Sequence, residues 1–206
     1  MRAATERRLA TDRGAPARDP FHHARCVAVF GSSDPAEGDP LYEQAREVGR
    51  LLARRGATVV TGGYGGVMEA ASRGAREAGG HALGITTRAF AGTRSGPNPF
   101  LTRHCEEEGL FERTRELIGC SAGYIILSGK AGTLAELTFL WALHRARLLG
   151  DRPIVLLGER WEQFVESIRA LNLVDESQLA VTRVAETASE AVLMVCGTLT
   201  VLDDSR

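Results

Sequence analysis

Ser128-Gly129-Lys130-Ala131-Gly132-Thr133-Leu134-Ala135-Glu136 joins a predicted buried strand to a predicted helix. The apolar run 124–127 before it is typical of a buried strand, and residues 134–149 are expected to form a helix. A glycine-rich turn from strand to helix directs backbone N–H groups outward at the positive end of the helix dipole. The stretch therefore predicts an anion site, which we interpret as a site for the phosphate of a nucleotide.

Strands and helices alternate on both sides of this stretch. Short apolar runs predict strands, and amphipathic stretches bounded by glycine or capping residues predict helices. The expected strands are 26–30, 58–61, 82–85, 123–127, 153–157 and 180–184. The expected helices are one from the Asp39 cap to Gly56, then 67–78, 107–119, 134–149 and 161–171, and one after the capping box 187–190, with a long irregular loop at 86–105. This alternation predicts an α/β fold, a doubly wound, Rossmann-like parallel sheet with helices on both faces.

The composition is typical of a globular protein, because 44% of the 206 residues are apolar. We expect one nucleotide-binding domain over residues 25–206 after a flexible, Arg-rich tail at 1–24. A net charge of −1 predicts no attraction to nucleic acid or membrane surfaces. No apolar run reaches the roughly 18 residues that span a bilayer, and no secretory signal is predicted. Four widely spaced cysteines without a C-x-x-C pattern favour a cytoplasmic protein with reduced thiols, and no metal or cofactor is expected.

Three polar or glycine-rich segments are expected at the carboxyl edge of the sheet, where doubly wound proteins bind their ligands. Their alignment favours a phosphorylated ligand, although a parallel sheet also needs tight turns for purely structural reasons. The candidate binding residues are Gly31, Ser32, Ser33, Gly62, Gly63, Gly65, Gly66, Gly129, Lys130, Ala131, Gly132 and Thr133. Neither glycine turn matches the G-x-G-x-x-G or the Walker A pattern, which disfavours NAD chemistry and NTP hydrolysis.

Two charged residues are expected at the same edge. Arg113 lies early in helix 107–119, which follows the end of strand 82–85, and Glu136 lies in the first turn of its helix. A carboxylate beside a phosphate site suits hydrolysis of a glycosidic bond, because it can stabilise an oxocarbenium-like state and orient a water. The alternatives are structural. Thr133-x-x-Glu136 is also a capping-box pattern, and Arg113 has the charged neighbours of a surface residue.

Gly31-Ser32-Ser33, the turn 62–68, Arg113-Thr114 and the stretch 128–136 together resemble the motifs of the LOG family, cytokinin-activating phosphoribohydrolases. The resemblance extends over about residues 25–195. It implies that Arg113 and Glu136 are the catalytic pair and that Met68 belongs to the binding site. It also implies hydrolysis of AMP, often N6-modified, to a free base and ribose 5-phosphate. Such a protein is expected to be a homodimer or higher homo-oligomer in which neighbouring subunits help to form the site.

The chain departs from the family pattern at several positions. Ser128 replaces a proline, Lys130 a glycine, Thr114 a lysine and Glu69 a small residue. A lysine in place of glycine is unfavourable if the backbone at this position needs a positive φ. Alternatively, Lys130 supplies the positive charge that Thr114 lacks. Lys130 is also the only lysine of the chain, a feature compatible with a functional role and with chance.

Functions of two classes are compatible with these observations. The first is a hydrolase for the N-glycosidic bond of a nucleoside 5′-monophosphate. The alternative is a non-catalytic protein that binds a nucleotide or carries a phosphorylated cofactor such as the molybdenum cofactor. The altered loop favours this alternative. Lysine decarboxylation, an older label for the family, is disfavoured, because Lys130 lies in a phosphate loop and not where a PLP Schiff base is expected.

Overall fold

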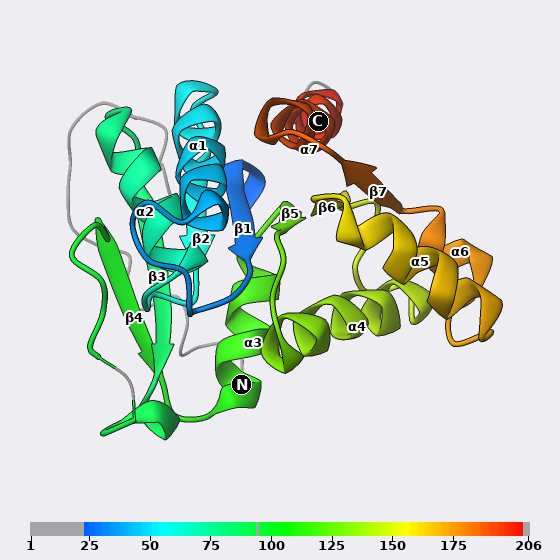
Figure 1. Ribbon diagram of the computed structural model, residues 1–206, viewed down its shortest axis with the longest axis horizontal. Coiled ribbons are helices and arrows are strands. Elements are labelled where there is room, and N and C mark those ends of the chain that lie inside the picture. The colour runs from blue at the N-terminus through cyan, green and yellow to red at the C-terminus, as the bar shows by residue number, and fades with distance from the viewer. Residues whose placement is uncertain (1–22, 94, 204–206) are drawn as a thin grey trace.

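A sheet of parallel strands lies at the centre of the computed structural model (Figure 1). The structure describes residues 23–93 and 95–203, and within them the sheet has seven strands in the order β4-β3-β2-β1-β5-β6-β7. The strands are β1 Cys26–Phe30, β2 Thr58–Thr61, β3 Ala82–Thr87, β4 Arg103–Glu107, β5 Gly123–Ile126, β6 Ile154–Leu157 and β7 Thr182–Ala185. The strand order reverses between β1 and β5, so the topological switch point of this doubly wound sheet lies between them.

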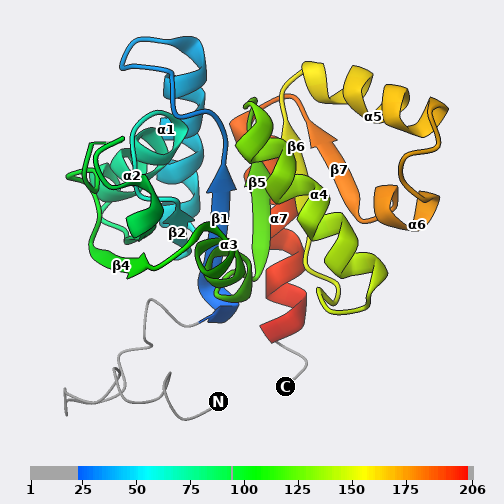
Figure 2. The same cartoon turned by 90° about the horizontal axis from the view of Figure 1, so that it is seen from below.

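Helices cover both faces of the sheet (Figures 1 and 2). One face carries α1 Pro40–Arg54, α2 Val67–Glu77 and α7 Ala188–Asp203; the other carries α3 Leu110–Gly119, α4 Ala131–Arg145, α5 Arg160–Ala170 and α6 Glu176–Leu179. Successive side chains of a strand point to opposite faces, which explains why the central strands are continuous apolar runs. In β1, Val27 and Val29 pack in the core below the first group of helices, and Ala28 and Phe30 pack below the second. The predicted fold class is confirmed.

Strand β4 corrects the predicted irregular loop at 86–105. Residues Arg103–Glu107 pair in parallel with β3, and a short 3₁₀ helix forms at Arg88–Phe90. β4 lies at the edge of the sheet, and exposed His104 and Glu106 alternate with half-buried neighbours. Such charged edge strands limit pairing with other chains, but they lack the apolar run by which a strand is recognised in a sequence.

Two predicted helix starts are also wrong. The helix predicted at 107–119 begins at Leu110, because residues 103–107 belong to β4. Its N-terminus still lies at the carboxyl edge, since β4 runs parallel to β3 and ends at that edge. The helix predicted at 134–149 begins at Ala131 and ends at Arg145. The early start brings the whole Gly132-Thr133 dipeptide into the helix.

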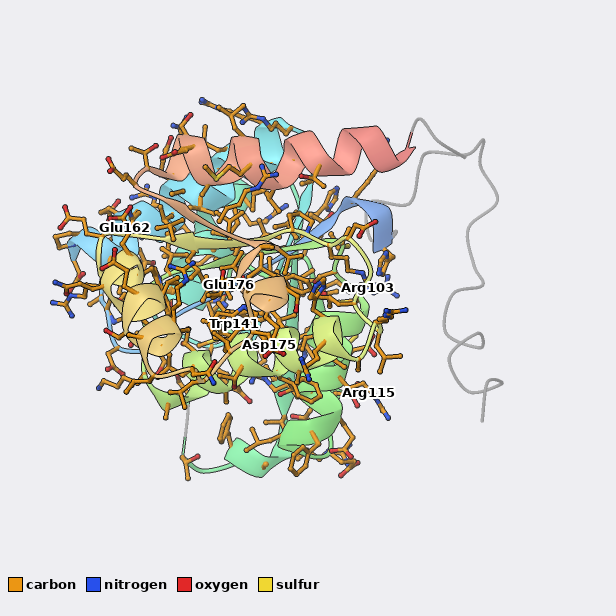
Figure 3. The ribbon with its side chains drawn as sticks, turned by 90° about the vertical axis from the view of Figure 1, so that its right-hand side faces the viewer. Arg103, Arg115, Trp141, Glu162, Asp175 and Glu176 are labelled. Carbon is orange, nitrogen blue, oxygen red and sulfur yellow. The ribbon has the colours of Figure 1, made fainter. Side chains whose placement is uncertain are left out.

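Helix α6 has only four residues, too few for a periodic pattern, and its one local signal in the sequence is the capping box of Asp175 and Gln178. Its hydrogen bonds attach it to α4 and β7: Gln178 Nε2 donates to the carbonyl of Trp141 at 3.1 Å, and the carbonyl of Gln178 accepts from Thr182 Oγ1 at 3.0 Å. Trp141 Nε1 in turn donates to Thr182 Oγ1 at 2.8 Å, which joins α4 to β7. Asp175 caps α6 and forms an ion pair with Arg145 at the end of α4. Trp141, Asp175 and Glu176 are labelled together in Figure 3. These contacts fix the C-terminal part of α4 against the sheet.

The predicted tail, residues 1–24, lies outside the described residues except for His23 and Ala24. These two belong to a short 3₁₀ helix, His23–Arg25, immediately before β1. Within the part of the chain that the structure describes, no helix has both the length and the apolar character needed to cross a membrane.

The thiol of Cys120, at the C-terminal end of α3, is expected to be unreactive. Burial raises its pKa from the ordinary value of 9.0 to about 12. At pH 8 the thiolate fraction, and with it the alkylation rate, is then about 1,000-fold lower than in the unfolded chain. Because the native pKa is the higher one, Cys120 contributes stability below pH 9 that is lost as the pH rises toward 12.

The alkylation rate can be followed by mass spectrometry of the tryptic peptide 116–130, in which Cys120 is the only cysteine. The same protein unfolded in urea is the reference. Equal rates of reaction with iodoacetamide in the native and unfolded protein would contradict the prediction.

Candidate functional site

The three predicted edge segments lie side by side, at the carboxyl ends of the adjacent strands β2, β1 and β5. Ser32 connects the other two: its N–H donates to the carbonyl of Ser128 at 3.0 Å, and its own carbonyl accepts from the N–H of Val67 at 2.9 Å. Gly66, at the N-cap of α2, has φ +70°, and a Cβ there would lie 2.5 Å from the carbonyl oxygen of Ser32. Glycine at position 66 thus allows the turn to approach the segment after β1.

The start of α4 has the backbone arrangement on which the predicted anion site depends. Because the helix begins at Ala131, the N–H groups of residues 131–133 belong to its first turn, where intrahelical acceptors are lacking. Ala131 and Gly132 are exposed, whereas the side chain of Thr133 is buried against Gly129. Lys130 is the N-cap residue and has an extended backbone, with φ −106°. The replacement of glycine by lysine at position 130 therefore causes no backbone strain.

Arg113 is buried, which overturns its interpretation as a surface residue. Only 7% of it is exposed, and its Nε donates to the carbonyl of Ile85, at the carboxyl end of β3, at 2.8 Å. Its Nη2 lies 4.0 Å from Met68 Sδ, and its guanidinium carbon lies 5.7 Å from the centre of the Tyr64 ring. A Cβ at Gly62 would lie 2.9 Å from the same guanidinium carbon. The guanidinium of Arg113 thus packs against Gly62 and Met68, two of the predicted site residues.

Two residues that the sequence analysis left out of the site hold this glycine turn in place. Asn98, which is buried, donates through its N–H to the carbonyl of Gly63 at 2.8 Å and through Nδ2 to the carbonyl of Tyr64 at 3.1 Å. The Tyr64 hydroxyl donates to the carbonyl of Thr87 and accepts from the N–H of the same residue. The position of Tyr64 inside the glycine turn was a signal for its role, but no local pattern indicated that Asn98 folds back over this turn.

The sequence predicts Glu136 in the first turn of its helix, but in the structure it lies in the second turn of α4. Since the helix begins at Ala131, Thr133 is a helical residue and Glu136 is not part of a capping box. Glu136 is half-buried. Helices α3 and α4 lie on the same face of the sheet and close together in both views, so the helices of Arg113 and Glu136 are neighbours (Figures 1 and 2).

The remaining predicted site residues divide into buried and accessible groups. Gly62, Gly63, Gly66, Met68 and Thr133 are buried, and Gly31, Ser32, Ser33, Gly65, Gly129, Lys130, Ala131 and Gly132 are half-buried or exposed. Apart from Gly65, which follows β2, the accessible group lies at the carboxyl ends of β1 and β5, that is, at the switch point. A ligand that reaches the site from solvent therefore meets this second group first.

An ion pair joins two of these segments across the switch point. Lys130 Nζ lies 2.6 Å from Asp34 Oδ2, in the segment that follows β1. The Lys130 ammonium lowers the pKa of the Asp34 carboxyl, and the carboxylate in turn raises the pKa of Lys130. In this structure the Lys130 side chain therefore faces the first edge segment.

Comparison with known proteins places these features in a family. The sequence model of the SLOG cluster4 family matches residues 24–194. The chain belongs to this family. The match covers all seven strands and both helix layers up to the middle of α7. It confirms the resemblance to LOG proteins, of which this chain is a divergent member.

Two mycobacterial relatives of this SLOG cluster4 protein bear the name cytokinin riboside 5′-monophosphate phosphoribohydrolase. The one from Mycobacterium tuberculosis is 32% identical over 152 residues, which are 70% of this chain and 75% of the relative. The one from Mycobacterium marinum is 32% identical over 173 residues, or 82% and 87% of the two chains. Among solved structures, the molybdenum cofactor carrier protein of Chlamydomonas reinhardtii superposes with a TM-score of 0.63 at 25% identity, over 85% of this chain and 98% of the carrier.

Proposed function

We propose that this protein hydrolyses the N-glycosidic bond of a nucleoside 5′-monophosphate, AMP or N6-modified AMP, and releases the free base and ribose 5-phosphate. The observation that supports the proposal is the burial of Arg113. Its side chain donates to the carbonyl of Ile85 and packs on the Tyr64 ring of the glycine turn. The first-turn N–H groups of α4 lie at the same edge of the sheet. A guanidinium that is buried beside exposed N–H groups at this edge is a functional-site candidate, because buried charged side chains concentrate at such sites. The names of the two mycobacterial relatives support the same activity.

In the proposed mechanism the phosphate binds the backbone N–H groups of residues 131–133, where the helix dipole favours negative charge. Glu136, one turn further along α4, lies beside the ribose. As the bond between base and ribose breaks, its carboxylate stabilises the oxocarbenium-like C1′ and orients the attacking water. The water oxygen becomes the new hydroxyl of ribose 5-phosphate, and one water proton ends on the base. Arg113 compensates the negative charge that the departing base acquires.

The experiment is incubation of the pure protein with AMP and with N6-isopentenyl-AMP, followed by chromatography of the released base. Equal amounts of base and ribose 5-phosphate are expected. Release from adenosine, which lacks the phosphate, should be far slower. If no monophosphate releases base, the proposed hydrolase function is wrong.

A second candidate function is that of a carrier for a nucleotide or a phosphorylated cofactor. The observation that favours it is the superposition on a molybdenum cofactor carrier protein along almost the whole length of that protein. The altered loop, with Ser128 and Lys130, also separates this chain from the hydrolase motif. Mass spectrometry of ligand that co-purifies with the protein distinguishes the two, because a carrier retains its ligand intact and a hydrolase does not.

We further propose that two or more copies associate through the helices that carry Arg113 and Glu136. Leu110 and Phe111 at the start of α3 are 46% and 88% exposed, and Phe139 of α4 is 44% exposed. Large exposed apolar side chains grouped on neighbouring elements are typical of protein interfaces. Light scattering on the purified protein measures the association, and a monomer at micromolar concentration would contradict it.

A further inference from the structure

The ion pair between Lys130 and Asp34 is unexplained by the proposed chemistry. It joins the N-cap of α4 to the segment after β1, with 2.6 Å between Nζ and Oδ2. The side chains are 81% and 56% exposed, so both charges remain largely hydrated. Exposed ion pairs contribute little to stability, and salt screens them. Folding therefore does not account for the pair.

The backbone places these two charges at the entrance of the proposed phosphate site. The hydrogen bond from Ser32 N–H to the carbonyl of Ser128 brings the two segments together just before each charged residue. Asp34 is oriented by its own N–H, which donates to Ser32 Oγ at 3.2 Å, and by the Ser33 hydroxyl, which donates to its carboxylate at 3.5 Å. Lys130 directly precedes the N–H groups of residues 131–133. Its ammonium is thus the cation next to the position where a phosphate would bind.

A phosphate monoester competes with Asp34 for this ammonium. It carries close to two negative charges at neutral pH and three acceptor oxygens, whereas the Asp34 carboxylate carries one charge. Lysine binds phosphate as a point charge on a flexible stem, so its head group can move between the two anions. The negative charge of Asp34, beside Lys130, also repels a phosphate that binds at the start of α4. The ion pair therefore disfavours binding of singly charged anions, whereas a phosphate group can replace Asp34 as the partner of Lys130.

We propose that Lys130 selects for a phosphorylated ligand and that Asp34 is its counter-ion in the ligand-free protein, exchanged for the phosphate on binding. This inference rests on one part of the proposed function, namely that the ligand carries a phosphate group. It therefore applies equally to a hydrolase and to a carrier. It assigns to Asp34 a role opposite in sign to that of Lys130. Lys130 strengthens binding of the phosphate, and Asp34 weakens it.

Two substitutions of opposite effect test the inference. Asp34→Asn keeps the shape of the side chain and removes the competing charge, so the Kd for AMP should fall about fivefold. Lys130→Met keeps a long side chain and removes the ammonium, and the Kd should rise about tenfold. The Lys130 side chain makes no hydrogen bond that caps α4, so its loss leaves the start of the helix intact. Adenosine binding should change less than twofold in both variants.

Matched controls come from the ion pair between Arg169 of α5 and Glu176 of α6, with 3.0 Å between Nε and Oε1. Glu176→Gln and Arg169→Met change the net charge by the same amounts, and should leave the Kd for AMP unchanged. Isothermal titration calorimetry with AMP, adenosine and inorganic phosphate gives all the constants, and AMP is titrated into proteins that also carry Glu136→Gln, so that it is bound and not hydrolysed. Raising the salt from 50 to 300 mM should reduce the effect of both site variants.

Opposite shifts in the Kd for AMP at positions 34 and 130, absent from the controls, would support the inference. Shifts of the same sign, no shift, or equal shifts in the controls would overturn it. Equal affinity of the unaltered protein for AMP and adenosine would overturn it as well. Failure of the hydrolase proposal is a separate result: AMP then binds and responds to both substitutions, but no base is released.

Discussion

Glu136→Gln is expected to lower kcat for base release from AMP by about 1,000-fold, because removal of a charge that acts in the transition state typically costs 10²–10⁴ in rate. Glutamine has the same shape but no negative charge, so it cannot stabilise the oxocarbenium-like C1′ or activate the water. The interaction is made mainly in the transition state. KM should therefore change little while kcat and kcat/KM fall together.

The position of Glu136 makes this substitution informative. It lies in the second turn of α4, outside the capping positions, and is half-buried. A loss of activity therefore does not result from a lost helix cap. Glu136→Asp retracts the carboxylate by one methylene and should retain part of the activity. Glu166→Gln, at an exposed position on α5, is the matched control and should leave kcat unchanged.

Base release and thermal unfolding should be measured on the same preparations. If Glu136→Gln keeps more than a tenth of the kcat with an unchanged Tm, Glu136 is not the catalytic carboxylate. A large fall in Tm would instead indicate a structural role for this side chain. The AMP affinity of the inactive variant separates catalysis from binding, since Glu136→Gln should still bind AMP as tightly as the unaltered protein.

The sequence was sufficient for the parts of the fold that depend on apolar patterning. Strands β1, β2, β5 and β6 are buried along their whole length, and each appears as a short run of apolar or β-branched residues, with one glycine in β5. Strand β4 escaped detection because it lies at the sheet edge and alternates half-buried with exposed positions. Helix starts were the least certain feature. Gly132 and Thr133 have the composition of a cap but lie inside α4, where Thr133 packs on Gly129.

The location of the candidate site could be predicted, but its contacts could not. Glycine turns after β1, β2 and β5 must meet at one edge of a parallel sheet, whatever their side chains do. The burial of Arg113 had a local signal, because it lies four residues before Leu117 and so on the buried side of α3. The contacts of Asn98 with residues 63 and 64, and of Asp34 with Lys130, join segments distant in sequence. Only the three-dimensional arrangement brings these residues together.

Gly74→Ala is expected to destabilise the protein by about 3 kcal/mol or more, at the upper end of the range for overpacking. Gly74 of α2 packs directly on the backbone of α1, and an added Cβ would overlap the carbonyl oxygen of Arg46 and lie 2.7 Å from the carbonyl carbon. Backbone atoms cannot rotate away as a side chain can, so the helices must separate. For a protein of this size the loss corresponds to a fall in Tm of about 6–12 °C.

The control for Gly74→Ala is Gly197→Ala, in the exposed part of α7. Among the described residues, no atom outside the adjoining backbone of α7 lies within 4 Å of a Cβ at position 197, so the substitution should stabilise the helix by about 0.5–1 kcal/mol through the propensity of alanine. Thermal unfolding followed by circular dichroism compares the two variants. A Tm for Gly74→Ala within 2 °C of the unaltered protein would show that α1 and α2 are not in backbone contact.

Gly49, a second glycine at the α1–α2 contact, allows a double-mutant test in which the stability losses of Gly49→Ala, Gly74→Ala and the double variant are compared. A Cβ at Gly49 of α1 would overlap the carbonyl oxygen of Ala71 in α2, so Gly49→Ala should also be strongly destabilising. Both substitutions push the same two helices apart, and the separation forced by one makes room for the other. The double variant should therefore lose less stability than the sum of the single losses. Because Gly66 at the start of α2 packs on Ser32, this separation should also weaken AMP binding, whereas Gly197→Ala should not.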